Sequence, residues 1–297
     1  MAKNSTSNDN GRGMEFLYVE LLCKELGFIP SQRTVRYQER DRGKFQELTV
    51  CLKDEFRRGG QCFIEWVRKK FLTHKVNKLI VDRLSDGDGV KGDVTDIRLL
   101  MDDICVNISL KHNHAAFKHQ RPSNLPCQCG FEKKDQKTLL YKQEYTEIGK
   151  QFIQDAKLVL PGNNLFKTLK DNNPEYINKK LYSPICNIVV KFINENVKGD
   201  KVNTLFRFLV GNLSFYKVIS YSNYLEILQY SELSVPKNVS ATVHNDSYIL
   251  LEFDNQWVFD MRLHTASSRI DRNVSLKFDS QAKSCEVPKE IIEYKYD

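Results

Sequence analysis

An aspartate, a serine and a lysine lie at spacings that bring them together if two short strands form a hairpin. Apolar and polar side chains alternate over residues 104–111, so Ser109 and Lys111 are expected on the polar face of a strand. Residues 95–100 predict the preceding strand, and the residues between the two suit a turn. Pairing about that turn places Asp96 beside Ser109 and diagonal to Lys111. An aspartate that can bind a divalent cation, next to a lysine that can orient a water, suits metal-assisted hydrolysis.

Two further acids are candidates for this group. Residues 13–27 predict a helix, and Glu15 projects from the middle of its apolar arc, close to the direction of Val19. A carboxylate buried there needs a partner or a metal. A glutamate in the first turn could instead face solvent, where the helix dipole favours it. Asp93 precedes Asp96 by three residues, and its roles as a second metal ligand and as a loop residue both stay open.

The residues around this hairpin resemble a known family. The spacing Asp-x(n)-Ser-x-Lys is similar to a variant of the PD-(D/E)xK nuclease motif, with Ser109 in place of the middle acid. The chain resembles type II restriction endonucleases of the HaeIII-like kind in three blocks. The first block is GRGMEF near the start, and the second is GDVTDI followed by ISLKHNHAAFKHQR. The third block is MRLHTASSRID with SLKFDSQ near the end. The resemblance therefore covers most of the chain in three blocks.

The resemblance implies a type II site-specific deoxyribonuclease that uses Mg²⁺ to hydrolyse double-stranded DNA at a short, palindromic, G/C-containing site such as GGCC. It implies that Asp96 binds the metal with Glu15, and that Asp93 is a candidate third ligand. Related nucleases place an acid on the first helix, so Glu15 would compensate for Ser109. Lys111 would orient the attacking water and donate to the phosphate, and Ser109 would hold a water or contact the phosphate. A two-fold DNA site favours a homodimer, although a monomer that cuts each strand in turn is also compatible.

Two stretches are candidates for contact with DNA, one directly after the hairpin and one over residues 261–277. Both are rich in cationic and polar donors, which suit phosphate oxygens and base edges. The candidates are Asn113, His114, Lys118, His119, Arg121, Arg262, His264, Ser267, Ser268, Arg269 and Lys277. Without the resemblance, an ordinary surface loop explains the second stretch equally well. Cys127 and Cys129 with nearby histidines offer a zinc site as a weaker alternative, because Cys-x-Cys is not the usual zinc spacing.

Periodicity in the rest of the chain predicts the elements that position these residues. Helices are expected over 44–58 and 61–73 with a break at Gly59–Gly60, and over 135–157, 175–197 with an interruption near Pro184, and 202–210. After Gly211 the pattern changes to strands, with a hairpin turn at 254–256. The chain is therefore predicted to be α/β, with a mixed central sheet flanked by helices and a β-rich C-terminal portion. The expected organisation is a disordered tail over 1–12, a catalytic core with helical framing over 13–210, and a DNA-recognition portion over 211–297.

Composition is compatible with this interpretation and excludes some others. The chain has 297 residues and a formal net charge of +7, which fits an anionic partner without requiring one. Eight scattered cysteines without a visible secretory leader indicate free thiols in the cytoplasm. No apolar run approaches the ~20 residues of a membrane span, and no glycine-rich loop for a nucleotide cofactor is present. A structure-specific repair nuclease or resolvase and a non-catalytic DNA-binding protein on a nuclease scaffold stay open as alternatives.

Overall fold

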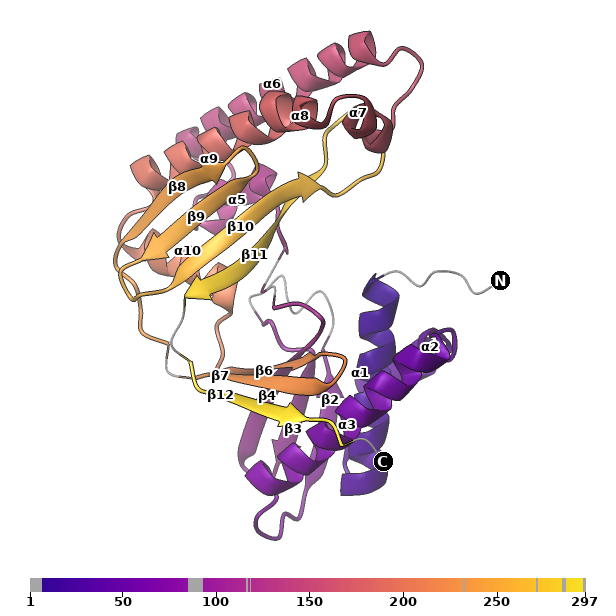
Figure 1. Ribbon diagram of the computed structural model, residues 1–297. Helices are drawn as coiled ribbons and strands as arrows, with labels where there is room; N and C mark the ends of the chain where they lie inside the picture. Colours follow the sequence, from indigo (N-terminus) through magenta and orange to yellow (C-terminus); the bar gives the residue numbers. More distant parts are fainter. Residues whose placement is uncertain are drawn as a thin grey trace. The chain divides into compact units, whose positions relative to one another are not determined.

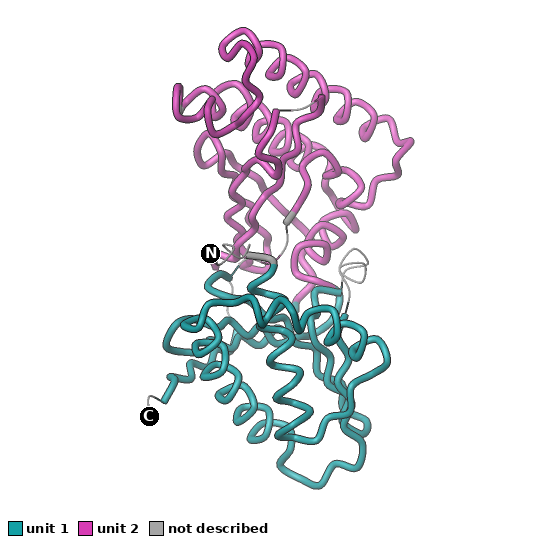
Figure 2. The backbone as a smooth tube through the Cα atoms, turned by 90° about the vertical axis from the view of Figure 1, so that its right-hand side faces the viewer, with its two compact units in different colours: residues 1–115, 212–233, 287–297 teal, residues 116–211, 234–286 magenta. Residues whose placement is uncertain are grey.

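The computed structural model describes residues 7–84, 93–115, 117, 119–231, 233–270, 272–284 and 287–295. The chain folds into two compact units that alternate along the sequence, and Figure 2 shows them in separate colours. Unit 1 consists of residues 1–115, 212–233 and 287–297, and unit 2 of residues 116–211 and 234–286. Within the described residues, no helix combines the length and the apolar character needed to cross a membrane.

Unit 1 is built on a seven-stranded mixed sheet, in the order β1-β2-β3-β4-β6-β7-β12. The strands are β1 (Ile29–Pro30), β2 (Leu79–Arg83), β3 (Ile97–Met101), β4 (Ile104–His112), β6 (Phe215–Ser220), β7 (Tyr224–Tyr230) and β12 (Lys289–Glu293). β1 pairs with β2 and β4 with β6 in parallel, and the other neighbours pair antiparallel. A parallel pair needs a long crossover, and residues of unit 2 supply it between β4 and β6.

Three helices lie beside this sheet (Figure 1): α1 (Ser7–Leu26), α2 (Gln32–Gln46) and α3 (Val50–Phe71). The residues before α2 and α3, Ser31 and Thr49, cap them, because each side-chain oxygen accepts a backbone N–H of the first turn. Buried side chains of α1 and α3 join the inward-facing residues of β2, β3 and β4 in one apolar core. This packing fixes α1 against the β3–β4 hairpin.

Unit 2 is built on a five-stranded antiparallel sheet, in the order β5-β11-β10-β9-β8. Its strands are β5 (His119–Gln120), β8 (Val239–Asn245), β9 (Tyr248–Phe253), β10 (Val258–Thr265) and β11 (Leu276–Ser284). Its helical elements are η1 (Pro122–Asn124), α5 (Leu125–Gln128), α6 (Gln136–Val159), α7 (Phe166–Asn172), α8 (Pro174–Ile177), the π-helical η2 (Asn178–Tyr182), α9 (Ser183–Asn196) and α10 (Asp200–Val210). The side chain of Asn194 in α9 bonds both backbone groups of Ala241 at 2.8 Å, which satisfies part of the exposed edge of β8.

The predicted fold class is confirmed. The central sheet is mixed and flanked by helices, and the chain after residue 214 forms strands β6 to β12. The hairpin turn expected at 254–256 joins β9 to β10, and the interruption expected near Pro184 is the π-helical turn before α9.

The helix break predicted at Gly59–Gly60 is wrong, because α3 runs through both residues without interruption. A Cβ on Gly59 would lie 2.6 Å from the hydroxyl oxygen of Tyr18, and one on Gly60 would lie 2.4 Å from a methyl carbon of Leu21. The glycines therefore serve close packing of α3 on α1. The actual helix boundary lies just before Thr49, within the single helix predicted over 44–58.

The structure describes the chain at both boundaries that were expected for its organisation. α1 begins at Ser7 instead of Gly13, and the ion pair of Asp9 with Lys44 of α2, at 3.1 Å, holds its first turn in place. The expected boundary after residue 210 coincides with the crossing from unit 2 to unit 1, but residues 116–211 belong with 234–286. The assignment of catalysis and DNA recognition to separate portions stays a prediction.

Candidate active site

The β3–β4 hairpin brings the predicted aspartate, serine and lysine together. Its register pairs Ile97 with Ile108, and the backbone N–H of Asp96 donates to the carbonyl of Ile108 at 2.9 Å. The Ser109 hydroxyl and the Lys111 ammonium each donate to Oδ2 of Asp96 at 3.0 Å. The predicted grouping of these three side chains is therefore confirmed, with Asp96 directly before the first residue of β3.

One carboxylate oxygen of Asp96 collects all these donors. Oδ2 also accepts the backbone N–H of Leu110 at 2.7 Å, and Lys111 makes a second bond, to the carbonyl of Leu110, at 3.0 Å. No residue that the structure describes donates to Oδ1, and 25% of the Asp96 side chain is exposed. Oδ1 is therefore free to bind a ligand that arrives from solvent.

Glu15 reaches the same place from α1. Its Oε2 accepts a hydrogen bond from Nη2 of Arg83 at 2.5 Å, and its side chain is 22% exposed. Burial, followed by repulsion from Asp96, raises the pKa of Glu15 to about 7, against the opposing effects of Arg83 and Lys111. Its charge interacts with those of Asp96 and Lys111, and its role as a metal ligand together with Asp96 stays a prediction.

Arg83 was not among the predicted site residues, yet it fixes Glu15. It is fully buried at the end of β2, and it also donates to Asp41 at 3.0 Å and to Gln38 at 3.1 Å, both on α2. Burial would raise the pKa of Asp41, but the hydrogen bond from Arg40 and the charges of Arg83 and Arg40 hold that pKa below its usual value. A buried charge network therefore ties α1, α2 and β2 together behind the site.

A second cation that the sequence reasoning missed is Lys217 of β6. The register of β4 with β6 pairs it directly with Ser109, and only 1% of it is exposed. Its ammonium donates to the carbonyl of Ala115 at 3.0 Å, so it anchors the segment that follows β4. A single lysine inside an otherwise apolar strand was the available signal.

The donor atoms here fit a hard divalent cation. Such ions take oxygen ligands, and Mg²⁺ in particular keeps several waters. Glu15 and Asp96 supply carboxylates, Leu110 supplies a carbonyl, and a cation would relieve the repulsion that contributes to the raised pKa of Glu15. Within the described ranges, no group of three or more His, Cys, Asp or Glu is arranged to hold a metal. An ion at this site would therefore need carbonyl, water or phosphate oxygens as well.

Asp93 is engaged in a different set of contacts. Its Oδ2 pairs with Arg98 at 2.5 Å, and its Oδ1 accepts the backbone N–H of Thr95 at 3.1 Å. Arg98 in turn donates to Asn107 at 2.7 Å. If Asp93 bound a metal through Oδ2, the metal would have to replace Arg98 as the partner of that oxygen. The role of Asp93 as a ligand stays a prediction.

The candidates for DNA contact after the hairpin fall into both units. In unit 1, Asn113 and His114 are exposed, and Asn113 has a positive φ of 57° with its N–H donating to Ser220 at 3.0 Å. In unit 2, Arg121 is exposed and donates to the hydroxyl of Ser275 at 3.2 Å. Lys118 and the side chain of His119 lie outside the described residues.

The second group of candidates lies near the end of β10, in the loop that follows it and at the start of β11. Arg262 and His264 lie on the same face of β10, and Lys277 of β11 pairs with His264. His264 is 2.8 Å from a carboxylate oxygen of Asp279. The loop after β10 carries the exposed Ser268 and Arg269, and the hydroxyl of Ser267 caps it by accepting the N–H of Arg269 at 3.1 Å. The structure therefore groups these residues in unit 2, and their contact with DNA stays a prediction.

The thiol pair in unit 2 differs from a typical metal site. Cys129 is buried as a free thiol, and burial raises the pKa of this thiol well above its usual value. Among the described residues, no group of three or more His, Cys, Asp or Glu is arranged around this pair to hold a metal. His112, one of the nearby histidines in the sequence, contacts Glu55 of α3 at 3.0 Å.

An acid–serine–lysine cluster beside a second acid, on a mixed sheet, is suited to cation-assisted hydrolysis, and comparison with known families defines the class. Residues 11–234 match the family described as HaeIII restriction endonuclease. Because the match covers most of the chain, this protein belongs to that family and is a type II site-specific deoxyribonuclease.

The chain is also similar to an individual relative. It is 26% identical over 332 residues to the type II restriction enzyme HaeIII of Haemophilus aegyptius, and the match spans 97% of each chain. No solved structure matches the chain at a significant level.

Proposed function

We propose that the protein cuts double-stranded DNA at a short palindromic site, with Mg²⁺ bound between Glu15 and Asp96. The observation that carries this proposal is the set of interactions around the Asp96 carboxylate. Ser109 and Lys111 donate hydrogen bonds to it, and the charge of Glu15 interacts with it. Membership of a restriction endonuclease family supports DNA as the substrate. The resemblance noted in the sequence favours a G/C-containing site such as GGCC.

Each side chain has a separate task in the proposed reaction. When bound, the divalent cation stabilises charge on the scissile phosphate and lowers the pKa of a water. Lys111, held by two bonds to Asp96 and Leu110, points its remaining donor at the attacking water and the phosphate. Ser109 orients the carboxylate of Asp96 and takes the place of the middle acid of the PD-(D/E)xK motif.

A palindromic site presents the same bonds twice, so we propose a homodimer with one active site for each strand. The DNA contacts come from the two candidate groups, of which Arg262, His264 and Lys277 lie together on the sheet of unit 2. The described cysteines are free thiols, which supports action in the cytoplasm, where thiols stay reduced.

The test is incubation with phage DNA and Mg²⁺, followed by sequencing of the fragment ends. Discrete fragments that share one terminal sequence are expected. A repair nuclease or resolvase reads DNA structure instead of sequence, so it would leave a long plasmid without discrete bands. A DNA-binding protein without activity would shift the DNA in a gel and leave it intact with either Mg²⁺ or Mn²⁺.

A matched pair of variants assigns the activity to this site. Lys111→Ala is expected to lower the cleavage rate by a factor on the order of 10² or more while duplex binding persists. Lys69→Ala is the control, because Lys69 is 80% exposed and its contact to Glu65 is 3.9 Å. Equal cleavage by Lys111→Ala and the wild type would refute the assignment.

A further inference from the structure

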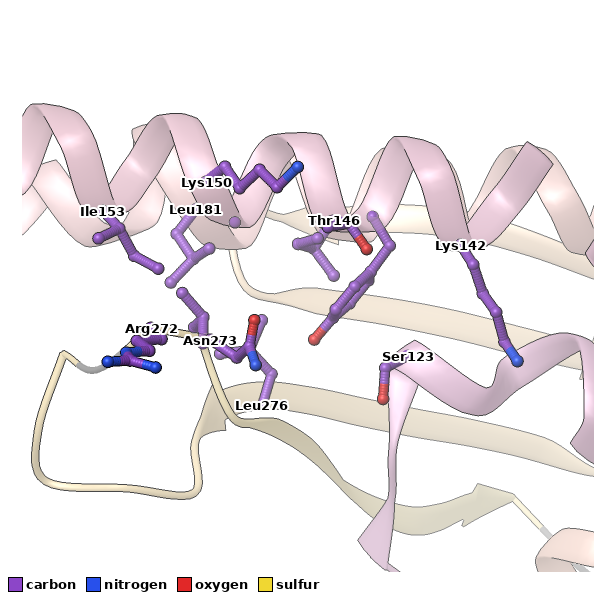
Figure 3. A pocket seen from close by; sticks show the side chains of 13 residues that line it. Ser123, Lys142, Thr146, Lys150, Ile153, Leu181, Arg272, Asn273 and Leu276 are labelled. Carbon is purple, nitrogen blue, oxygen red and sulfur yellow. The ribbon is translucent and has the colours of Figure 1, made fainter. Parts of the chain in front are cut away.

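Unit 2 contains a hollow of about 320 Å³ that shares no residue with the candidate active site. Figure 3 shows side chains of α6, among them Thr146 and Lys150, on one side of it and Asn273 and Leu276 on the other. Ser123 of η1 closes one end. The volume lies at the lower end of the range of small-molecule sites, ~300–1,000 Å³.

The charged residues that the structure describes in the lining of the hollow all have one sign. Lys142, Lys150 and Arg272 line it, and none of the described lining residues is acidic. Among the described residues, none of these three cations has an ion-pair partner, whereas Lys167 and Lys179 of the same unit pair with acids one helical turn away. Unpaired cations that line a hollow produce a positive potential that attracts an anion.

The floor of the hollow is apolar and partly aromatic. It is formed by Tyr145 and Ile153 of α6, Leu181 of η2 and Ile185 of α9, with Leu276 opposite. An inorganic anion does not require such a floor, and an apolar ligand does not require three cations. A planar heterocycle joined to a phosphate matches both the apolar floor and the cations of the lining. Bases stack on aromatic rings, and cations bind the phosphate.

We propose that this hollow binds a nucleotide, with the phosphate held by cations of the lining and the base on the Tyr145 floor. The hydroxyl of Ser123 and the amide of Asn273 supply donors and acceptors for the edge of the base. The chain belongs to a family of deoxyribonucleases, so nucleotides are the planar anions that its substrate supplies. Two sources share this chemistry: a nucleotide turned out of the bound duplex and a free nucleoside monophosphate.

The first experiment is calorimetric titration of the full chain with deoxynucleoside monophosphates, with the matching nucleosides and with inorganic phosphate. A monophosphate is expected to bind about tenfold or more tightly than either fragment, because only it engages both halves of the hollow. Absence of saturable binding, or phosphate binding as tightly as the nucleotide, would overturn the proposal. Neither outcome bears on DNA cleavage, so this test is independent of the function proposed above.

Two variant pairs locate the binding in the hollow. The double variant Lys150→Gln with Arg272→Gln is expected to weaken nucleotide binding about tenfold or more. Lys157→Gln is the control and should leave binding unchanged, because Lys157 is exposed on the same helix outside the hollow.

Gly149→Met fills the hollow and is expected to abolish binding. Gly149→Ala should retain it, because the added Cβ meets only a methyl group of Val274, at 3.9 Å. Unchanged binding in Gly149→Met, with the wild-type circular dichroism spectrum, would refute the location.

A third measurement separates the two sources. Duplex DNA carrying 2-aminopurine becomes brighter when that base leaves the stack. An increase with the wild type that is lost in Gly149→Met identifies a nucleotide of the duplex as the ligand. Binding of monophosphate without such an increase identifies the free nucleotide.

Discussion

Arg83 and Glu15 form an ion pair inside unit 1, with Nη2 of Arg83 2.5 Å from Oε2 of Glu15 and 3.0 Å from Oδ2 of Asp41. One buried guanidinium therefore joins an acid of the candidate active site to a second acid that is fully buried. The position of Glu15 is set by β2 and α2 as well as by its own helix. Buried ion pairs of this kind keep an active-site carboxylate in a fixed geometry.

Replacement of Arg83 by methionine should destabilise the fold strongly. Arg83→Met removes the cation that Glu15 and Asp41 share and leaves Asp41 with its Arg40 pair, so a loss of roughly 3–5 kcal/mol in the free energy of unfolding is expected. Urea denaturation measures it. Arg33→Met is the control, because Arg33 pairs with Asp82 at a more exposed position, with 39% of its side chain exposed, and a loss within about 1 kcal/mol is expected. Equal losses in the two variants would contradict this account of Arg83.

Glu15 should make stability depend on pH in a direction opposite to that of an ordinary ion-paired acid. Its pKa is raised from 4.5 to about 7 by burial and Asp96, against Arg83 and Lys111, so the folded state binds this proton more tightly than the unfolded state. Below pH 4.5 both states are protonated. As the pH rises toward 7 the unfolded state ionises first, and the wild type loses about 3 kcal/mol relative to Glu15→Gln.

Chemical unfolding of both proteins between about pH 4 and pH 8, in a chelator, tests this linkage. The unfolding free energy of the wild type minus that of Glu15→Gln is expected to fall by about 3 kcal/mol over that interval. A value that does not change with pH, or that rises with pH, would show that the pKa of Glu15 is not raised.

Two helix glycines should respond in opposite directions to alanine. A Cβ on Gly59 of α3 would lie 2.6 Å from the hydroxyl of Tyr18 and 2.7 Å from that of Tyr294, so Gly59→Ala is expected to cost about 1–3 kcal/mol. Gly43 of α2 has nothing within 4 Å of such a Cβ, so Gly43→Ala should stabilise by up to about 1 kcal/mol. Thermal unfolding compares them, and stabilisation by Gly59→Ala would disprove the close packing of α1 on α3.

The parts of the site that the sequence predicts are those set by local periodicity. Strict alternation over residues 104–111 was enough to place Ser109 and Lys111 on one face, and a short turn then brought Asp96 to them. The period of a single helix placed Glu15 on the apolar side of α1, whereas its assignment to the metal came from the resemblance and stays a prediction. Such patterns depend only on the geometry of one element or one hairpin.

What the sequence did not reveal depends on packing between distant elements. Arg83 is two residues after the buried Val81 on β2, so alternation alone pointed it inward, but its acidic partner on α2 could not be identified without the tertiary structure. Gly59 and Gly60 read as a helix break because glycine disfavours helices, whereas their role is close contact with α1. The crossing of the chain between the two units also depends on long-range pairing, that of β4 with β6.

The central claim is that Glu15 and Asp96 act on the same ion, and a double-mutant cycle of cleavage tests it most directly. Single-turnover cleavage of a duplex containing the site is measured with Mg²⁺ for Glu15→Gln, Asp96→Asn and the variant that combines them. Each single change is expected to slow cleavage by a factor on the order of 10² or more, and the combined variant should be no slower than the slower single variant. Losses that multiply in the combined variant, or wild-type cleavage by Glu15→Gln, would contradict the claim.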